Sequence, residues 1–267
     1  MAGTGARRWR GAAPELFALA AIMTATVQRC STADELANAA AALFCEAACE
    51  AVKARGRFCV VLPGGRTPAL LFGALREAPW AEIAPWRDSH FFWSDERCVP
   101  ADHAASNYGL ARRELLTRVP IPAGHVHRAP TEIGAAKLAA AAWEHALREF
   151  FGAADRAPVL PEFDLAILGV GADGHTASLF PRGPELNVSG HWVAAVAPTG
   201  TPPVARLTLT LPVFNHARHV MFLAAGPDKR HIVDAIAAGH DAARGDFPAA
   251  RISPREQPLW LYTEAPL

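Results

Sequence analysis

The sequence DLAILGVGADGHTASLFP, residues 164–181, changes from an apolar run to a polar turn that is rich in glycine. The run Leu165–Leu168 is typical of a buried strand, and the glycines that follow it end the strand. Asp173 and His175 lie in this turn, where glycine lets the backbone approach a ligand closely. Because histidine exchanges protons near neutral pH, the stretch predicts a strand that delivers His175 to a reaction site. A histidine that only caps the turn is the alternative, but it leaves the glycines unexplained.

A similar change from strand to turn occurs earlier in the chain. The apolar run Phe58–Leu62 is followed by PGGRTP, residues 63–68, and then by a predicted helix. Thr67 is the expected N-cap and Pro68 the expected first helical residue. Free backbone N–H groups and the positive end of the helix, with Arg66 beside them, would suit a phosphate. An ordinary turn is the better interpretation of G-G-x-T alone. Since the P-loop and dinucleotide patterns are absent, a monophosphate is favoured over ATP or NAD.

Charged residues also follow other predicted strands. The run His90–Trp93 ends in SDER, residues 94–97, and the run Val220–Ala224 ends shortly before Lys229. Arg206 begins a further strand of alternating pattern. Ligands of open α/β sheets bind at the carboxyl ends of the strands, so these side chains are candidates for one shared site. For residues 94–97, a solvated charged turn is an equally good interpretation.

The rest of the chain alternates between helix and strand patterns. Thr32 and Glu35 have the spacing of a capping box, and the helix that they begin is expected to end at Arg55. Two further helices are expected over residues 104–117 and 135–151, the latter on the surface with Glu144 on its polar side. Further strands are expected over residues 192–196 and 259–262. This alternation predicts an α/β fold.

Charge and composition limit the kinds of partner. The chain has 267 residues, and its 26 Lys and Arg balance 26 Asp and Glu. No net charge favours nucleic acid or a membrane surface, so the expected partner is a small molecule, and the expected assembly is a monomer or a small homo-oligomer. Five cysteines without a C-x-x-C spacing indicate reduced thiols and a cytoplasmic location. His125 and His127 alternate along an extended segment without a third ligand nearby, so no metal site is expected there.

The ends of the folded unit follow from the same patterns. Residues 1–25 are expected to be a leader that is disordered or not part of the native fold, with Met23 as the natural start. Residues 26–267 are expected to form a single catalytic α/β domain.

Seven sequence blocks together resemble the 6-phosphogluconolactonase family in both order and spacing. They are LPGGRTP (62–68), SDERCVP (94–100), SNYGLARRELL (106–116), VHRAP (126–130), DLAILGVGADGHTASLFP (164–181), RLTLT (206–210) and GPDK (226–229). The resemblance implies a modified doubly wound, Rossmann-like sheet, mostly parallel and flanked by helices, as in glucosamine-6-phosphate deaminase and ribose-5-phosphate isomerase. It also implies hydrolysis of 6-phosphogluconolactone to 6-phosphogluconate in the oxidative pentose phosphate pathway, without a metal or an organic cofactor.

The matching residues supply the groups that lactone hydrolysis needs, namely a base, an acid and a feature that stabilises the oxyanion. His175 is the expected base and then the acid. Either Asp173 or Asp95 is expected to orient its ring, and the sequence leaves that choice open. Arg97 is the candidate contact to the lactone carbonyl or the sugar oxygens, with a salt bridge to Asp95 or Glu96 as its alternative role.

A phosphate dianion is best held by several donors that converge from different strand ends. The candidates for this role are Gly64, Gly65, Arg66, Thr67, Arg206 and Lys229. Gly169 and Gly171 are expected to give the substrate close access to the backbone. Family members often carry a lysine where this chain has residues 199–201, so one sugar-phosphate contact loses its support here.

Two other functions compete with lactone hydrolysis. One is a sugar-phosphate deaminase or isomerase on the same architecture, but its relatives typically place an aromatic residue after the acidic pair, where this chain has Arg97. The other is a non-catalytic sugar-phosphate sensor, against which the intact Asp173 and His175 argue.

Overall fold

The computed structural model describes residues 25–152, 159–239, 245 and 247–267. The expected leader and Met23 lie outside the described residues, apart from Ala25. In the described ranges, no helix combines the length and the apolar character needed to cross a membrane.

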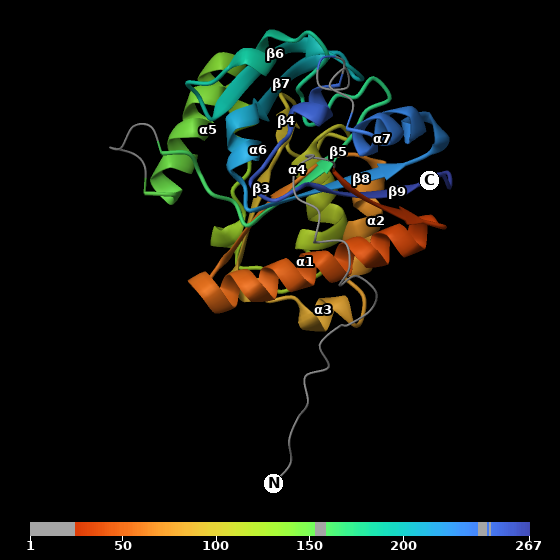
Figure 1. The fold of residues 1–267 in the computed structure, drawn as a ribbon. Helices are drawn as coiled ribbons and strands as arrows, with labels where there is room; N and C mark the ends of the chain where they lie inside the picture. The colour runs from red at the N-terminus through yellow and green to blue at the C-terminus, as the bar shows by residue number, and fades with distance from the viewer. Residues whose placement is uncertain (1–24, 153–158, 240–244, 246) are drawn as a thin grey trace.

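The centre of the fold is a sheet of six parallel strands in the order β1-β9-β8-β5-β2-β3 (Figure 1). Its strands are β1 (Thr26–Cys30), β2 (Phe58–Leu62), β3 (Ser89–Trp93), β5 (Leu165–Gly169), β8 (His219–Ala225) and β9 (Leu259–Thr263). The prediction of a mostly parallel, doubly wound sheet is confirmed. β2 has the predicted bounds, whereas β1 was not predicted, because its short sequence TVQRC is mostly exposed and carries little apolar pattern.

A second, smaller sheet of three antiparallel strands has the order β4-β7-β6. Its strands are β4 (Asp95–Arg97), β6 (Val193–Thr199) and β7 (Val204–Leu209). The interpretation of residues 94–97 as a solvated turn is therefore wrong, since the backbone of β4 pairs with β7 and the side chains of Asp95 and Glu96 are buried. Arg206 lies inside β7 and does not begin it.

The seven α-helices are α1 (Ala33–Arg55), α2 (Arg66–Leu75), α3 (Trp80–Ile83), α4 (Asn107–Ala111), α5 (Ala136–Phe150), α6 (Leu211–His216) and α7 (Arg230–Ala237) among the described residues. A π-helical turn, Arg112–Leu116, continues α4, and short 3₁₀ turns occur at Trp86–Asp88, Ala123–His125, Thr131–Ile133, Pro184–Asn187, Pro227–Lys229 and Pro248–Arg251. Figure 1 shows α1 and α3 below the large sheet, and α5 with the small sheet above it.

The helix ends test the predicted caps. The Thr32 hydroxyl accepts the Glu35 N–H at 3.1 Å, and Gly56 ends α1 with a left-handed φ of 73°, as the sequence predicts. The prediction for α2 is wrong by two residues. Its N-cap is Gly65, with a φ of 106°, so Thr67 lies inside the helix and caps nothing.

The helix α5 also differs from its prediction as a surface helix with Glu144 on the polar side. Glu144 is buried, and its Oε2 accepts the N–H groups of Trp192 and Val193 at 3.0 and 3.3 Å. The carboxylate therefore fixes the start of β6 against α5, while Arg148 pairs with its other oxygen.

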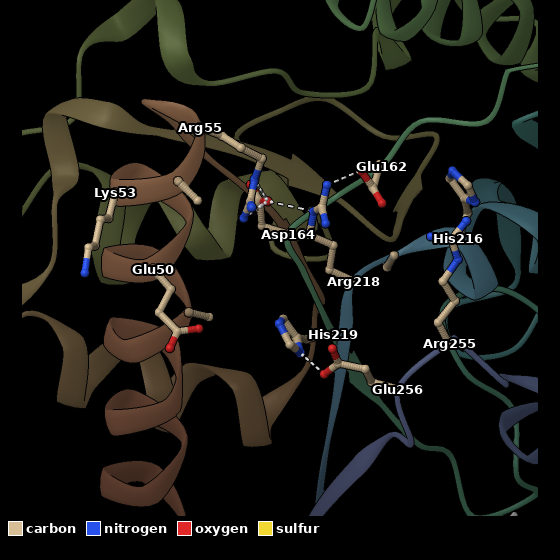
Figure 2. A pocket seen from close by; sticks show the side chains of 13 residues that line it. Glu50, Lys53, Arg55, Glu162, Asp164, His216, Arg218, His219, Arg255 and Glu256 are labelled. Carbon is tan, nitrogen blue, oxygen red and sulfur yellow. Dashed lines mark hydrogen bonds and ion pairs between the residues drawn. The ribbon is translucent and has the colours of Figure 1, made fainter. Parts of the chain in front are cut away.

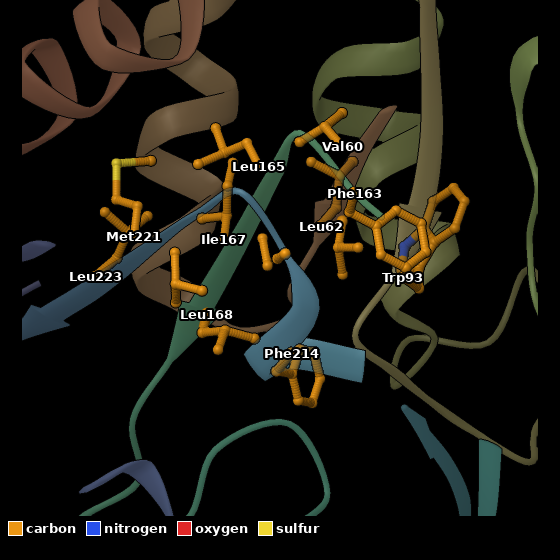
Figure 3. Close-up of a cluster of buried hydrophobic side chains, with 14 of the residues drawn as sticks. Val60, Leu62, Trp93, Phe163, Leu165, Ile167, Leu168, Phe214, Met221 and Leu223 are labelled. Atoms are coloured by element: carbon orange, nitrogen blue, oxygen red, sulfur yellow. The ribbon is translucent and has the colours of Figure 1, made fainter. Parts of the chain in front are cut away.

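The core lies around the four central strands and is almost completely apolar. Figure 3 shows Val60, Ile167 and Met221 from three neighbouring strands packed in one cluster with Phe163 and Phe214. Each such fully buried side chain stabilises the fold by about 1.5–3 kcal/mol relative to exposure. A rigid core of this kind holds the strand ends at fixed separations.

At the amino ends of the strands, ion pairs surround Asp164. Its Oδ2 accepts the Cys59 N–H at 2.7 Å, its Oδ1 accepts Arg55 Nε at 2.9 Å, and Arg218 bridges it to Glu162 (Figure 2). The four charged residues of this network line a cavity of about 560 Å³. The network ties α1, β2, β5 and β8 together at the edge opposite the predicted site.

Candidate active site

The carboxyl ends of β2, β3, β5 and β8 surround a polar cleft of about 250 Å³. The predicted site residues that line this cleft are Gly64, Gly65, Arg66, Thr67, Asp95, Arg97, Gly169, Gly171, His175, Arg206 and Lys229. Asp173 is the only predicted site residue that does not line it. Its carboxylate contacts the ring of His175, which does line the cleft. Segments from five parts of the chain thus meet at one edge of the sheet.

His175 and Asp173 form a local pair in the turn after β5. The ring Nδ1 of His175 lies 2.5 Å from Asp173 Oδ1, which also accepts the His175 backbone N–H at 3.1 Å. A Cβ added at Gly171 would lie 2.1 Å from His175 Nδ1, so only glycine leaves room for the ring. The turn is closed by the Gly171 N–H, which donates to the His175 carbonyl at 2.8 Å. The ring is therefore held through Nδ1, and Nε2 has no hydrogen-bond partner among the described residues.

The charge state of Asp173 follows from this pair. Burial alone would raise the pKa of Asp173, but the charge of His175 and the hydrogen bonds from its backbone and ring outweigh burial and lower that pKa. Asp173 is thus an anion at neutral pH.

Asp95 has different partners and makes no hydrogen bond to the His175 ring. Its carboxylate accepts the hydroxyls of Ser178 and Ser94 at 2.6 and 3.0 Å, and Asn107 Nδ2 at 3.3 Å. Of the two candidate carboxylates, Asp173 is the one that lies within hydrogen-bond distance of the His175 ring.

Glu96, next to Asp95, is buried and holds neighbouring backbone segments through hydrogen bonds. Its two oxygens accept the backbone N–H groups of Arg97, Asn107 and Tyr108 at 2.7–2.8 Å, and the hydroxyl of Ser106 at 3.1 Å. Burial raises the pKa of Glu96, although these hydrogen bonds oppose the rise. Glu96 therefore joins the start of α4 to β4, a role that the sequence did not distinguish from that of Asp95.

Two arginines lie side by side in the small sheet, because Arg97 in β4 pairs in register with Arg206 in β7. Arg97 Nη1 donates to the Ala105 carbonyl at 2.8 Å, while its buried Nε has no partner among the described residues. Arg206 is buried, and it donates to the carbonyls of Thr199 and Pro202 at 3.1 and 3.2 Å. Burial, and then the charge of Arg97, lower the pKa of Arg206. Much of the Arg206 guanidinium thus holds the β6–β7 loop.

The other end of the cleft is formed by the start of α2 and the end of β8. Gly65 is the N-cap of α2, and it lines the cleft together with Arg66 and Thr67 of the first turn, whose backbone N–H groups have no partner within the helix. Lys229 reaches the same end from the 3₁₀ turn after β8, with its Nζ 2.7 Å from Asp228 Oδ2. This end combines backbone donors with two cations and one carboxylate.

Among the cleft residues that the sequence did not identify as candidates, two carry polar side chains, Asn107 and Asp228. Asn107 donates to the Asp95 carbonyl at 2.8 Å, and a Cβ added at Gly64 would lie only 1.7 Å from Asn107 Oδ1. Both residues stand in blocks that carry the family resemblance, SNYGLARRELL and GPDK, but their side chains have no local pattern that indicates a ligand contact.

The structure also bears on metal binding. Within the described ranges, no group of three or more His, Cys, Asp or Glu side chains is arranged to hold a metal ion. His125 and His127 pack with His90, whose ring centroid lies 3.9 Å from that of His125, and His90 Nδ1 lies 3.1 Å from His127 Nε2. The three rings form a stacked cluster beside Phe92 and Phe150.

Comparison with known proteins shows the family of this chain. Residues 31–260 match the family model described as glucosamine-6-phosphate isomerases/6-phosphogluconolactonase. A 6-phosphogluconolactonase of Synechocystis sp. is 40% identical over 79% of this chain and 84% of its own. The structure of 6-phosphogluconolactonase from Trypanosoma brucei is 30% identical with a TM-score of 0.80, over 91% of this chain and 97% of the other. A monomeric glucosamine-6-phosphate deaminase has a TM-score of 0.72 at 18% identity, over 89% and 97% of the two chains, which shows a common fold alone.

Proposed function

Because the chain belongs to the family of glucosamine-6-phosphate isomerases and 6-phosphogluconolactonases, we propose that its cleft hydrolyses 6-phospho-D-glucono-1,5-lactone to 6-phospho-D-gluconate. The chain is an enzyme of the 6-phosphogluconolactonase type, and its place is in the oxidative pentose phosphate pathway. The deaminase or isomerase alternative and the sensor alternative are not favoured, since the curated relatives that match most of the chain are named as lactonases.

In the proposed mechanism, His175 acts as base and then as acid. Nε2 takes a proton from a water molecule while the water oxygen forms a bond to the lactone carbonyl carbon. As the tetrahedral intermediate collapses, the bond from that carbon to the ring oxygen breaks, and the same proton passes from Nε2 to the ring oxygen. Asp173 holds Nδ1–H and stabilises the imidazolium that exists between the two steps.

The oxyanion of the intermediate forms near the arginine pair. Arg97 lines the cleft, and its guanidinium is the proposed donor to the developing charge. Arg206 contributes charge from the facing strand, but most of its donors hold the loop. We therefore propose that Arg206 acts beside Arg97 at the reacting end, whereas the sequence predicted that it binds the phosphate.

The phosphate of the substrate is proposed to lie at the opposite end of the cleft. Gly64, Gly65 and the first turn of α2 offer backbone N–H groups, and Arg66, Thr67 and Lys229 add side-chain donors. Close backbone approach at Gly169 and Gly171 lets the sugar ring span the two ends.

The observation that carries this proposal is the Asp173–His175 pair at the end of β5, in a cleft whose other end is a helix start with two cations. The test is a coupled assay with freshly generated lactone, in which His175→Ala should fall to the spontaneous hydrolysis rate while still binding 6-phosphogluconate. Full activity of this variant would remove the base assignment. Glucosamine 6-phosphate, offered in parallel, should release no ammonia.

We further propose that residues 26–267 form one catalytic domain, and that the enzyme acts in the cytoplasm as a monomer or small homo-oligomer. The free cysteines and the balance of charges support the cytoplasmic location. Light scattering of the purified full chain measures the oligomeric state directly.

A further inference from the structure

Lys229, which lies in the turn after β8 at the end of the cleft proposed to bind phosphate, already has an anionic partner. Lys229 Nζ donates to Asp228 Oδ2 at 2.7 Å, and both residues line the cleft. The Lys229 side chain is only 16% exposed, whereas that of Asp228 is 57% exposed. A largely buried lysine is therefore paired with a carboxylate that is itself open to solvent.

The charge on Asp228 is secure at neutral pH. The hydrogen bond from Lys229, the charge of Lys229 and that of Arg66 hold the pKa of Asp228 below its ordinary value. Asp228 is thus an anion within the field of both cations assigned to the phosphate. A phosphate that enters this end meets repulsion from Asp228 and competes with it for Lys229.

We propose that Asp228 is an internal counter-ion that competes with the ligand's phosphate for Lys229 and so limits the affinity of the cleft for product and free phosphate. This inference rests on the proposed function for the placement of the phosphate. Such a counter-ion would help the enzyme to release its product. Substrate and product carry the same phosphate, so tight binding of that group lowers KM but retains the product and does not accelerate the chemical step. A counter-ion in the cleft weakens both by a similar factor.

The test compares Asp228→Asn with the wild-type enzyme by calorimetric titration with inorganic phosphate and with 6-phosphogluconate at low ionic strength. Removal of the Asp228 charge beside a dianion should lower both dissociation constants by about three- to tenfold. The gain should shrink in high salt, because salt screens an exposed charge. Asp228→Glu keeps the charge and should stay close to wild type. Asp88→Asn is the matched control, since Asp88 is exposed, lies outside the cleft and changes the net charge equally.

Three results would overturn the proposal. Weaker binding of both ligands to Asp228→Asn would mean that Asp228 only holds Lys229 in position, and unchanged binding would mean that the two anions do not compete. Either result, or a wild-type enzyme that binds no phosphate at millimolar concentration, overturns the proposal. Tighter phosphate binding without lactonase activity in the wild type would instead support Asp228 as the counter-ion and reject the proposed function.

Discussion

At the scale of single residues, the proposed mechanism depends on the 2.5 Å contact between Asp173 and His175. Asp173→Asn keeps an oxygen near Nδ1 but loses the charge that stabilises the imidazolium. We expect kcat to fall by about 100-fold or more, with KM nearly unchanged, because the interaction strengthens during the reaction. Steady-state kinetics with freshly generated lactone measure this. A variant that retains kcat within a factor of about two, with thermal stability unchanged, would show that the carboxylate is not needed.

The residue scale also shows what sequence can identify in a site. His175 and Asp173 are two positions apart in a glycine-rich turn, so local pattern indicates both of them. Asp95 is different, because its three partners come from residue 94, from the start of α4 and from the turn after β5. No pattern near residue 95 reports those contacts, and this is why the sequence could not choose between the two carboxylates.

At the scale of the elements, Asp164 joins β2, β5 and the end of α1. Asp164→Asn should lower the free energy of unfolding by about 2–3 kcal/mol, because it leaves Arg55 and Arg218 with reduced charge compensation at a buried position. Urea denaturation followed by circular dichroism gives the value. The exposed pair of Arg29 and Asp234 is the control, and Asp234→Asn should cost less than about 1 kcal/mol. Equal losses in both variants would contradict the structural role of Asp164.

The elements that sequence predicts best are those with a strong local signal. β2 is a continuous apolar run, and α1 has a cap at each end, so both were predicted with their bounds. β4 has three residues, two of them acidic, and becomes a strand only because β7, far along the chain, pairs with it. Such a pairing is a tertiary effect, and hydrophobic periodicity does not contain it.

At the scale of the whole molecule, the histidine cluster of His90, His125 and His127 makes stability depend on pH. Burial and neighbouring histidines lower the pKa of His90 and of His127 from 6.5 to about 4, with a further contribution from Arg57 at His90. Between these values the unfolded chain binds more protons than the folded one, so the free energy of unfolding falls as the pH drops from 6.5 to about 4. Urea midpoints across this range measure the slope.

Two variants test whether His90 and His127 cause this slope of stability against pH. His90→Phe combined with His127→Phe replaces the two rings by rings that do not titrate, and the slope should flatten. His145→Gln removes an exposed histidine of α5 and should leave the slope unchanged. An unaltered slope in the double variant would assign the acid sensitivity to other groups, among them Asp173, whose lowered pKa acts in the same direction at lower pH.

The close approach of Gly64 to Asn107 has a consequence for how this enzyme can change over generations. A side chain at position 64 would overlap the Asn107 amide, so position 64 is confined to glycine while Asn107 is present. In a saturation library, Gly64→Ala should be rejected in the native background but partly tolerated beside Asn107→Ala, with a double-variant fitness above the sum of the single effects. The residue allowed in the turn after β2 would then depend on a residue of α4, although 43 positions separate Gly64 from Asn107.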